Sequence, residues 1–178
     1  MLPESSSLPL LRVLHDEVEV ESHRIADEHG ARLHCRRGCS QCCVDDLTVF
    51  DIEAERIRQK YPQLLAQESP HPRGMCAFLD GEWACRIYPD RPYVCRTQGL
   101  PLRWLDEDAE GEFVEYRDIC PLNEEGTPIE ELLEDECWTI GPVEERLSGL
   151  QRQHGGGVMK RVALRSLFPE TVTPESAP

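Results

Sequence analysis

Four of the nine cysteines of this chain lie within nine residues, CRRGCSQCC, from Cys35 to Cys43. Thiolates are soft ligands that suit zinc, copper(I) and iron–sulfur clusters. A free thiol gains nothing from neighbours of its own kind. The crowding therefore predicts a metal site, and it requires a fold in which the rest of the chain closes around this segment.

Four further cysteines follow at wider spacing, each at the predicted end of a short element. Two sites of four thiolates, or one iron–sulfur cluster with one zinc, would use all eight. Adjacent side chains normally point apart, so we expect Cys42 and Cys43 to serve different metals, or one of them to lie outside the coordination. Cys137 is expected to be a small core residue. The predicted metal ligands are Cys35, Cys39, Cys42, Cys43, Cys76, Cys85, Cys95 and Cys120.

The spacing of apolar residues predicts an amphipathic helix over residues 8–29 and a second helix that begins at Asp51 or Thr48. The first amides of this second helix would lie close to the cysteine cluster. Asp80 and Gly81 predict a hairpin within AFLDGEWACRIY. Two prolines then predict a helical turn that carries Cys95 and Arg96.

Further along the chain, LPLRWL and EFVEY predict a second hairpin, and helices are expected from Ile129, from Pro142 and over residues 158–168. The fold class is α+β: a small single domain of several helices with short β-hairpins around a cysteine-ligated metal centre. We divide it into an N-terminal helix (1–30), the cysteine-cluster domain (31–126), acidic then basic helices packed on that domain (127–169), and a disordered tail (170–178). The histidines are expected at the surface: His15, His23, His29 and His34.

The chain is strongly acidic, with 34 Asp and Glu against 19 Lys and Arg. Nucleic acid and anionic membranes are therefore excluded as partners. Residues 101–150 carry 16 of the acids against three Arg, which predicts either a solvated face or, over residues 104–145, a docking surface for a basic protein. The sequence shows no signal peptide and no run of 18 apolar residues, so we expect a cytoplasmic protein with reduced thiols.

Several segments together resemble a known family: RRGCSQCC, LTVFDIEAERI, CAFLDGEWACRIYPDRPYVCR and CPLNEEG. They resemble the YkgJ-type cysteine-cluster family, or CxxCxxCC zinc- or iron-chelating domain, over about residues 35–126. The resemblance implies a small metal-binding domain that uses the same eight cysteines and leaves Cys137 out. Three residues separate Cys35 from Cys39 where the family name implies two, so Cys35 is the weakest match. The resulting CxxxCxxC pattern also occurs in radical S-adenosylmethionine enzymes, but this chain lacks the length and strand–helix alternation of their barrel.

Two arginines flank Cys95 and are expected to help bind the cofactor. A metal held by four thiolates carries excess negative charge, so we predict that Arg91 and Arg96 donate hydrogen bonds to cluster sulfurs or to neighbouring carbonyls. The alternative is a surface salt bridge with a nearby acid: Asp80, Glu82 or Asp90.

The cofactor is expected to be an iron–sulfur cluster of the 4Fe–4S type or zinc, and dense cysteines beside arginines favour iron–sulfur. No nucleophile with a base and no phosphate-binding loop accompanies the cysteines. The sequence therefore predicts a redox or metal-handling accessory protein. The alternatives are an enzyme with an open metal position and an interaction module in which zinc is structural.

Overall fold

The longest helix, α1 (Ser7–Glu28), opens the part of the chain that the computed structural model describes, residues 7–169. The helix predicted over residues 8–29 is confirmed. Its buried apolar residues recur every three to seven positions, at Leu11, Leu14, Val18 and Ile25, because this spacing places them on one face. No helix among residues 7–169 is both long enough and apolar enough to cross a membrane.

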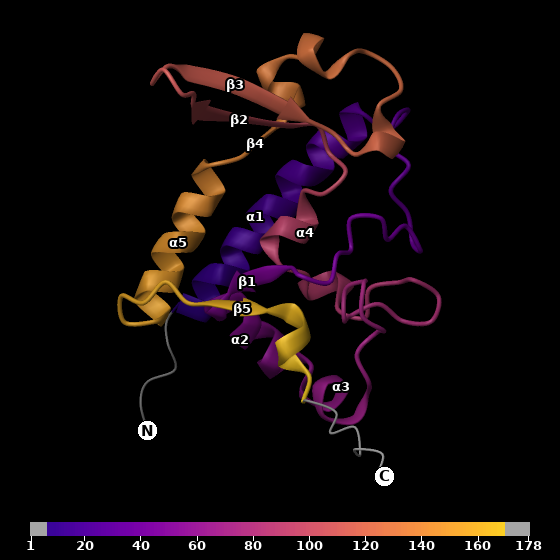
Figure 1. Ribbon diagram of the computed structural model, residues 1–178, viewed down its shortest axis with the longest axis vertical. Coiled ribbons are helices and arrows are strands. Elements are labelled where there is room, and N and C mark those ends of the chain that lie inside the picture. Colours follow the sequence, from indigo (N-terminus) through magenta and orange to yellow (C-terminus); the bar gives the residue numbers. More distant parts are fainter. Residues whose placement is uncertain (1–6, 170–178) are drawn as a thin grey trace, which may run out of the picture.

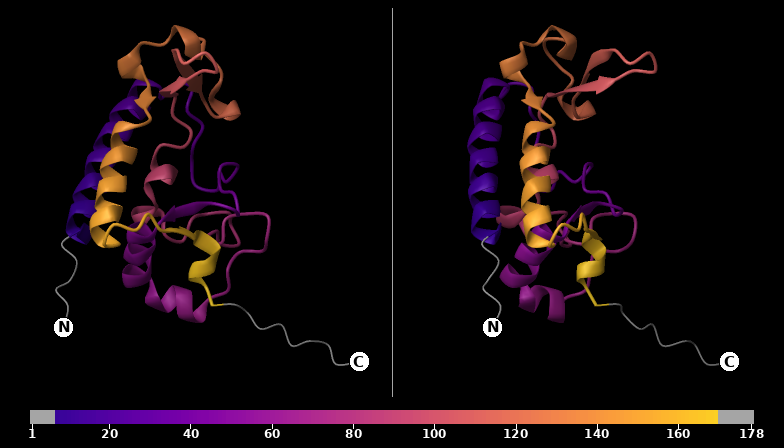
Figure 2. Two further views of the ribbon diagram at one scale, coloured as in Figure 1. Left: turned by 60° about the vertical axis from the view of Figure 1, so that its left-hand side comes forward. Right: turned by 90° about the vertical axis from the view of Figure 1, so that its left-hand side faces the viewer.

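Helix α5 (Pro142–His154) lies beside α1 and runs in the opposite direction (Figures 1 and 2). Between them and the short helix α4 (Tyr93–Arg96) lies one of two apolar clusters. Its aromatic members are Tyr93 and Trp138, and the indole Nε1 of Trp138 donates to the Tyr93 hydroxyl over 2.9 Å. The predicted helix from Pro142 and the turn that carries Cys95 are both confirmed.

The second apolar cluster lies beneath a two-stranded sheet, in which β1 (Thr48–Phe50) pairs antiparallel with β5 (Arg161–Ala163). It also includes residues of α2 (Asp51–Lys60) and α3 (Pro62–Gln67), two helices that Pro62 separates. The helix predicted over residues 158–168 is wrong. That segment is strand β5 followed by the 3-10 turn η5 (Leu164–Leu167), because pairing with the distant β1 buries Val162.

A three-stranded sheet forms the other end of the molecule, in the order β3–β2–β4. The predicted second hairpin is confirmed as β2 (Leu102–Glu107) and β3 (Phe113–Asp118), and β4 (Trp138–Thr139) joins β2 in parallel. Figure 2 shows that the hairpin extends beyond the helices. The described residues therefore form a small single α+β domain, as predicted.

The helix predicted from Ile129 is wrong. Two 3-10 turns occupy this stretch, η3 (Ile129–Glu131) and η4 (Glu134–Glu136). Acids that would be four residues apart on a helix repel one another, as Glu130 and Glu134 would. Arg117 instead binds the backbone carbonyls of Ile129 and Leu132, which holds the turns against β3.

Two loops carry most of the cysteines. One connects α1 to β1, and the other connects α3 to the turn η1 (Tyr88–Asp90). Both lie on the side of the molecule away from α1 and α5 (Figure 2). The first predicted hairpin is reduced to a single antiparallel bridge between Leu79 and Cys85, because Asp80 organises a five-residue loop by accepting hydrogen bonds from the amides of Glu82 and Ala84. The predicted tail, residues 170–178, lies outside the described residues.

Candidate metal centre

All nine cysteines are free thiols, and the eight predicted ligands come from four separate parts of the fold. Residues 35–43 supply four of them from the loop after α1. Cys76 and Cys85 come from the loop before η1, Cys95 lies in α4, and Cys120 precedes the turn η2 (Pro121–Asn123). A free thiol in each of these places is available to become a thiolate ligand.

Four of these thiols form what we call the first group: Cys35, Cys39, Cys42 and Cys120. Burial raises the pKa of Cys35, and the negative charges of its three neighbours in this group raise it further. This influence indicates that the four thiols lie in the same region of the fold, although 80 residues separate Cys39 from Cys120 in sequence. A cation among them would remove the repulsion.

The other four thiols form the second group: Cys43, Cys76, Cys85 and Cys95. Burial is the largest cause that raises the pKa of Cys95, and the charges of Cys76 and Cys85 add to it. Cys43 also interacts with Cys76 and Cys95, and its carbonyl accepts the Cys76 amide over 2.9 Å. The second group therefore combines residues from three places along the chain.

Cys42 and Cys43 join the two groups. A hydrogen bond between their thiols lowers the pKa of Cys42 and raises that of Cys43. These neighbouring side chains thus approach each other, contrary to the expectation that they point apart. Cys42 interacts with Cys35 of the first group and also with Cys95 of the second, whereas Cys43 interacts with Cys76 and Cys95. Cys42 therefore lies between the two groups, and we assign it to the first because it shares a loop with Cys35 and Cys39.

Backbone amides support two sulfurs of the second group. The amide of Phe78 donates to Cys76, and the amide of Ile87 donates to Cys85, which lowers the pKa of each thiol against the larger effect of burial. Amide donors two residues beyond a cysteine stabilise the thiolate form that a metal requires. The donor chemistry of both groups therefore fits a thiophilic metal, although no three or more Cys, His, Asp or Glu side chains within residues 7–169 converge as a complete metal site.

Arg91 and Arg96 are buried beside this centre, and their acidic partner is Glu19 of α1 rather than Asp80, Glu82 or Asp90. Arg96 donates to Glu19 over 2.7 Å, and Arg91 donates over 3.4 Å. Both also bind neighbouring carbonyls, Arg91 that of Tyr88 and Arg96 that of Pro89. The charge of Arg91 lowers the pKa of Cys85, so it can act on that sulfur from its present place. Contact of either arginine with a cofactor stays a prediction.

Asn123 is a site residue that the sequence analysis missed. It is fully buried, and its Nδ2 donates to the Gly99 carbonyl over 2.8 Å and to the sulfur of Cys35 at 3.6 Å. Its Oδ1 accepts the His34 amide, and its own amide donates to the Cys120 carbonyl over 2.7 Å. Asn123 thus links Cys35 to Cys120, the first and the last cysteine of the first group. An amide side chain three residues after Cys120 was the only signal in the sequence.

Gly99 shows how closely the chain packs around Cys35. Its φ is +93°, and a Cβ built there would lie 2.4 Å from the Cys35 sulfur. A side chain at this position would displace Cys35. The sulfur of Cys35, the weakest match to the family pattern, is therefore packed against the backbone of Gly99.

The predicted surface placement is wrong for two histidines. His15 and His29 are buried, whereas His23 and His34 are exposed. His15 Nε2 lies 3.3 Å from Glu53 Oε1, which also accepts the Tyr93 amide over 2.8 Å. This carboxylate raises the pKa of Cys95. Glu53 thus positions the start of α4 and, with it, a sulfur of the second group.

The beginning of α2 does not offer the free amides that the sequence suggested. The amide of Asp51 donates to the Lys160 carbonyl, and that of Ile52 donates to Gln151 Oε1. Asp51 is also the first residue of the helix, with Phe50 as the N-cap. These amides secure β5 and α5 and are not directed at the cysteines.

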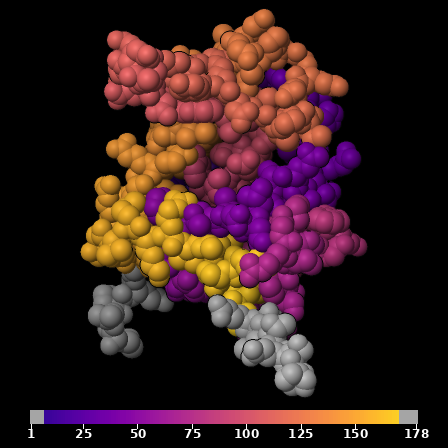
Figure 3. All heavy atoms as spheres, viewed as in Figure 1, coloured from indigo at the N-terminus to yellow at the C-terminus, as the bar shows by residue number. Residues whose placement is uncertain are grey.

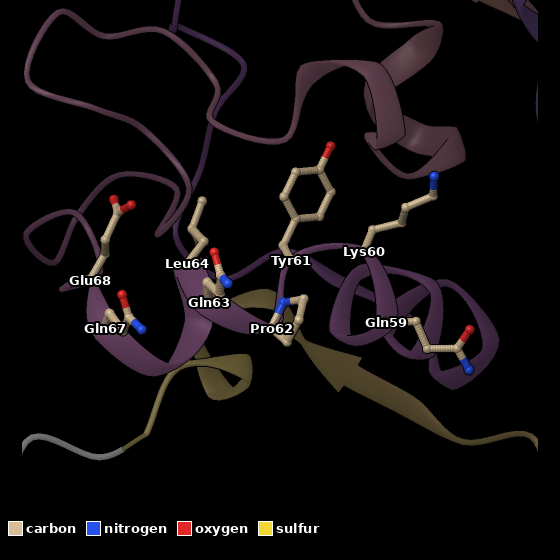
Figure 4. A pocket seen from close by; sticks show the side chains of 8 residues that line it. All are labelled: Gln59, Lys60, Tyr61, Pro62, Gln63, Leu64, Gln67 and Glu68. Carbon is tan, nitrogen blue, oxygen red and sulfur yellow. The ribbon is translucent and has the colours of Figure 1, made fainter.

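A surface hollow of about 540 Å³ lies along α2 and α3. Figure 4 shows its lining, residues 59–64, Gln67 and Glu68. None of the eight predicted ligands is among them. The Tyr61 hydroxyl donates to Asp90 over 2.9 Å, which fixes α2 to η1. The candidate centre is therefore the cysteine-rich region and not this hollow.

The sequence model of the CxxCxxCC family, described as "Putative zinc- or iron-chelating domain", matches residues 34–121. This segment contains all eight predicted ligands and excludes Cys137, which is buried in the structure. Searches of the curated proteins and of the solved structures gave no match. The family match supports metal binding by this segment and names zinc and iron as the alternatives.

Proposed function

We propose, from the family match to a zinc- or iron-chelating domain, that the protein binds metal through two sets of four thiolates. The first set is Cys35, Cys39, Cys42 and Cys120, and the second is Cys43, Cys76, Cys85 and Cys95. The observation that carries the proposal is that all eight cysteines are free thiols within the segment that the family model matches. The electrostatic influence of the thiols on one another supports their division into two sets. Four thiolates suit either a structural zinc or an iron–sulfur cluster.

The proposed role is that of a cytoplasmic redox or metal-handling accessory, with an iron–sulfur cluster as the first choice of cofactor. Bound in this way, a cluster would supply one-electron chemistry. The chain itself supplies the thiols, the amide donors at Phe78 and Ile87, and the cations of Arg91 and Arg86, which lower the pKa of Cys85. These groups all favour negative charge on sulfur.

The alternative is a zinc-stabilised interaction module, and the projecting β2–β3 hairpin favours it. An enzyme with an open metal position would require a site with fewer than four protein ligands. Both groups contain four cysteines, so neither leaves a position open if all four bind.

Anaerobic purification followed by elemental analysis and an absorption spectrum tests the proposal. We expect either iron with sulfide and a visible charge-transfer band, or zinc without colour. Cys42→Ser should reduce the metal of the first group, and Cys43→Ser that of the second. Cys137→Ser is the matched control, since this buried thiol belongs to neither group. A protein that binds no metal after anaerobic reconstitution with iron and sulfide, or with zinc, would refute the proposal.

A further inference from the structure

The β2–β3 hairpin is an arm that the rest of the chain covers only at its base. β4 pairs with Leu102 and Arg103 at the start of β2, and Arg117 ties the end of β3 to the carbonyls of Ile129 and Leu132. Residues 104–116 lie beyond these contacts. Figure 3 shows this part at one end of the molecular surface, and Figure 2 shows it extending past the helices.

Both faces of the arm expose large apolar side chains. On one face, Trp104 stacks on Tyr116 with ring centroids 5.7 Å apart. On the other face, Leu105 and Phe113 are diagonal neighbours in the strand register. They are 61% and 76% exposed. A two-stranded ribbon open to water on both faces is marginally stable by itself, and exposed apolar surface of this kind is typical of interaction sites.

The outer edge of the arm is also free. Among residues 7–169, β3 pairs only with β2, and the sheet order β3–β2–β4 leaves it at the edge. An unpaired edge can accept an extended segment of another protein as an additional strand. Its backbone hydrogen bonds would supply affinity, and the apolar side chains on either face would supply contacts for alternate residues of that segment.

The charge of the arm indicates which kind of partner would complement it. Residues 104–116 contain six carboxylates and no Lys or Arg. Glu115 is the only one of the six that forms an ion pair with a residue in the described range, to Arg103 over 2.6 Å and to Arg117 over 2.5 Å. The other five carboxylates form no ion pair with residues 7–169. A second copy of the arm would bring like charges together, whereas a segment with Lys or Arg would complement them.

We propose that the arm binds a basic, extended segment of a partner protein, which adds as a strand along the free edge of β3. The partner combines Lys or Arg with apolar residues, so that the charges meet the unpaired carboxylates of the arm while an apolar side chain covers Phe113 beside the free edge. This inference goes beyond metal binding and does not depend on which metal is bound.

Fluorescence anisotropy of a labelled peptide that alternates Lys with Val tests the proposal on the full, metal-loaded chain. We expect saturable binding that Leu105→Ser combined with Phe113→Ser weakens about ten-fold or more. Val20→Ser is the matched control, because Val20 is 72% exposed on α1 beside Glu19 and Glu21. A peptide that alternates Glu with Val should not bind, and N-methylation of alternate Lys–Val amides should abolish binding because strand addition needs those donors.

A second variant keeps the proposal testable if the first variant misfolds. Glu107→Gln combined with Glu112→Gln removes two charges and no apolar contact, and it should weaken binding and reduce its salt dependence. Unchanged metal content in each variant separates loss of the arm surface from loss of the metal centre. Equal binding by the native chain and both arm variants, or equally tight binding of oligolysine, would overturn the proposal. A dimer in sedimentation that depends on Phe113 would instead assign the arm to a second copy of this chain.

Discussion

The two cysteine groups differ in how the fold supports them. In the second group, Cys76 is part of the apolar cluster beneath the β1–β5 sheet, and Cys43 and Cys85 pack against it. The first group has no member in either apolar cluster, and its Cys35 and Cys42 are exposed. The buried Asn123 links two of its members: its side chain donates to the sulfur of Cys35, and its backbone amide donates to the carbonyl of Cys120. The comparison teaches that the second group of thiols is built into the core, whereas the first group lies outside it and adjoins the second through Cys42 and Cys43.

The largest effect is expected from loss of a ligand in the second group. Cys85→Ser should remove the metal of that group and destabilise the protein by several kcal/mol, since a structural zinc site contributes about 10–16 kcal/mol in zinc-finger peptides. Elemental analysis and urea unfolding measure the two effects. Cys137→Ser should leave the metal content unchanged. Retention of all metal in the Cys85 variant would break the assignment of this residue.

Truncation of the core should affect the second group more than the first. Phe78 is fully buried and packs on Phe168 with ring centroids 5.0 Å apart. Phe78→Ala should lower the free energy of unfolding by about 3–5 kcal/mol and weaken metal binding at the second group. Phe113→Ala, at an exposed position of the arm, is the control. Equal loss of metal from both groups in the Phe78 variant would contradict the difference between them.

The first group should depend instead on Asn123. Asn123→Ala removes the donor to Cys35 and leaves the buried Gly99 carbonyl and His34 amide without this partner, which costs about 1–3 kcal/mol for such a group. We expect metal loss from the first group only, measured by metal stoichiometry of this variant with and without Cys43→Ser. Leu122→Ala, one residue away and 40% exposed, serves as control.

The smallest expected effect is kinetic. Because the first group is more exposed, a chelator should remove its metal roughly ten-fold faster, as access to a site controls ligand exchange. Two phases of metal release should appear in the native chain, measured by absorbance of the chelator complex. Cys42→Ser should abolish the fast phase, and Cys43→Ser the slow one. A single phase in the native chain would show that the groups respond as one unit.

Local patterns in the sequence predicted several elements well. The apolar spacing of α1, the prolines before α4 and Pro142 at the start of α5 act through nearest neighbours, so they can be read without tertiary information. The cysteine pattern likewise identified the segment that the family model matches. The acidic stretch from Ile129 does not form the predicted helix. Repulsion between its carboxylates and hydrogen bonds from Arg117 to its carbonyls outweigh its helix propensity.

Contacts between distant segments explain the rest. Strand β5 exists because β1 offers a partner about 110 residues earlier in the chain. His15 is buried because α1 packs on α2, where Glu53 lies within reach. Asn123 and Gly99 meet at Cys35 only after three separate segments have folded together.

The sequence by itself determined that eight thiols would be available as soft ligands, since side-chain chemistry does not depend on the fold. It also determined the excess of acid on the arm. Only the tertiary structure decided which distant segments bring thiols near one another, with Cys120 near Cys35 and Cys76 near Cys43. The physical reason is that electrostatic influence between thiols depends on distance in space, and the packing of segments far apart in sequence sets that distance.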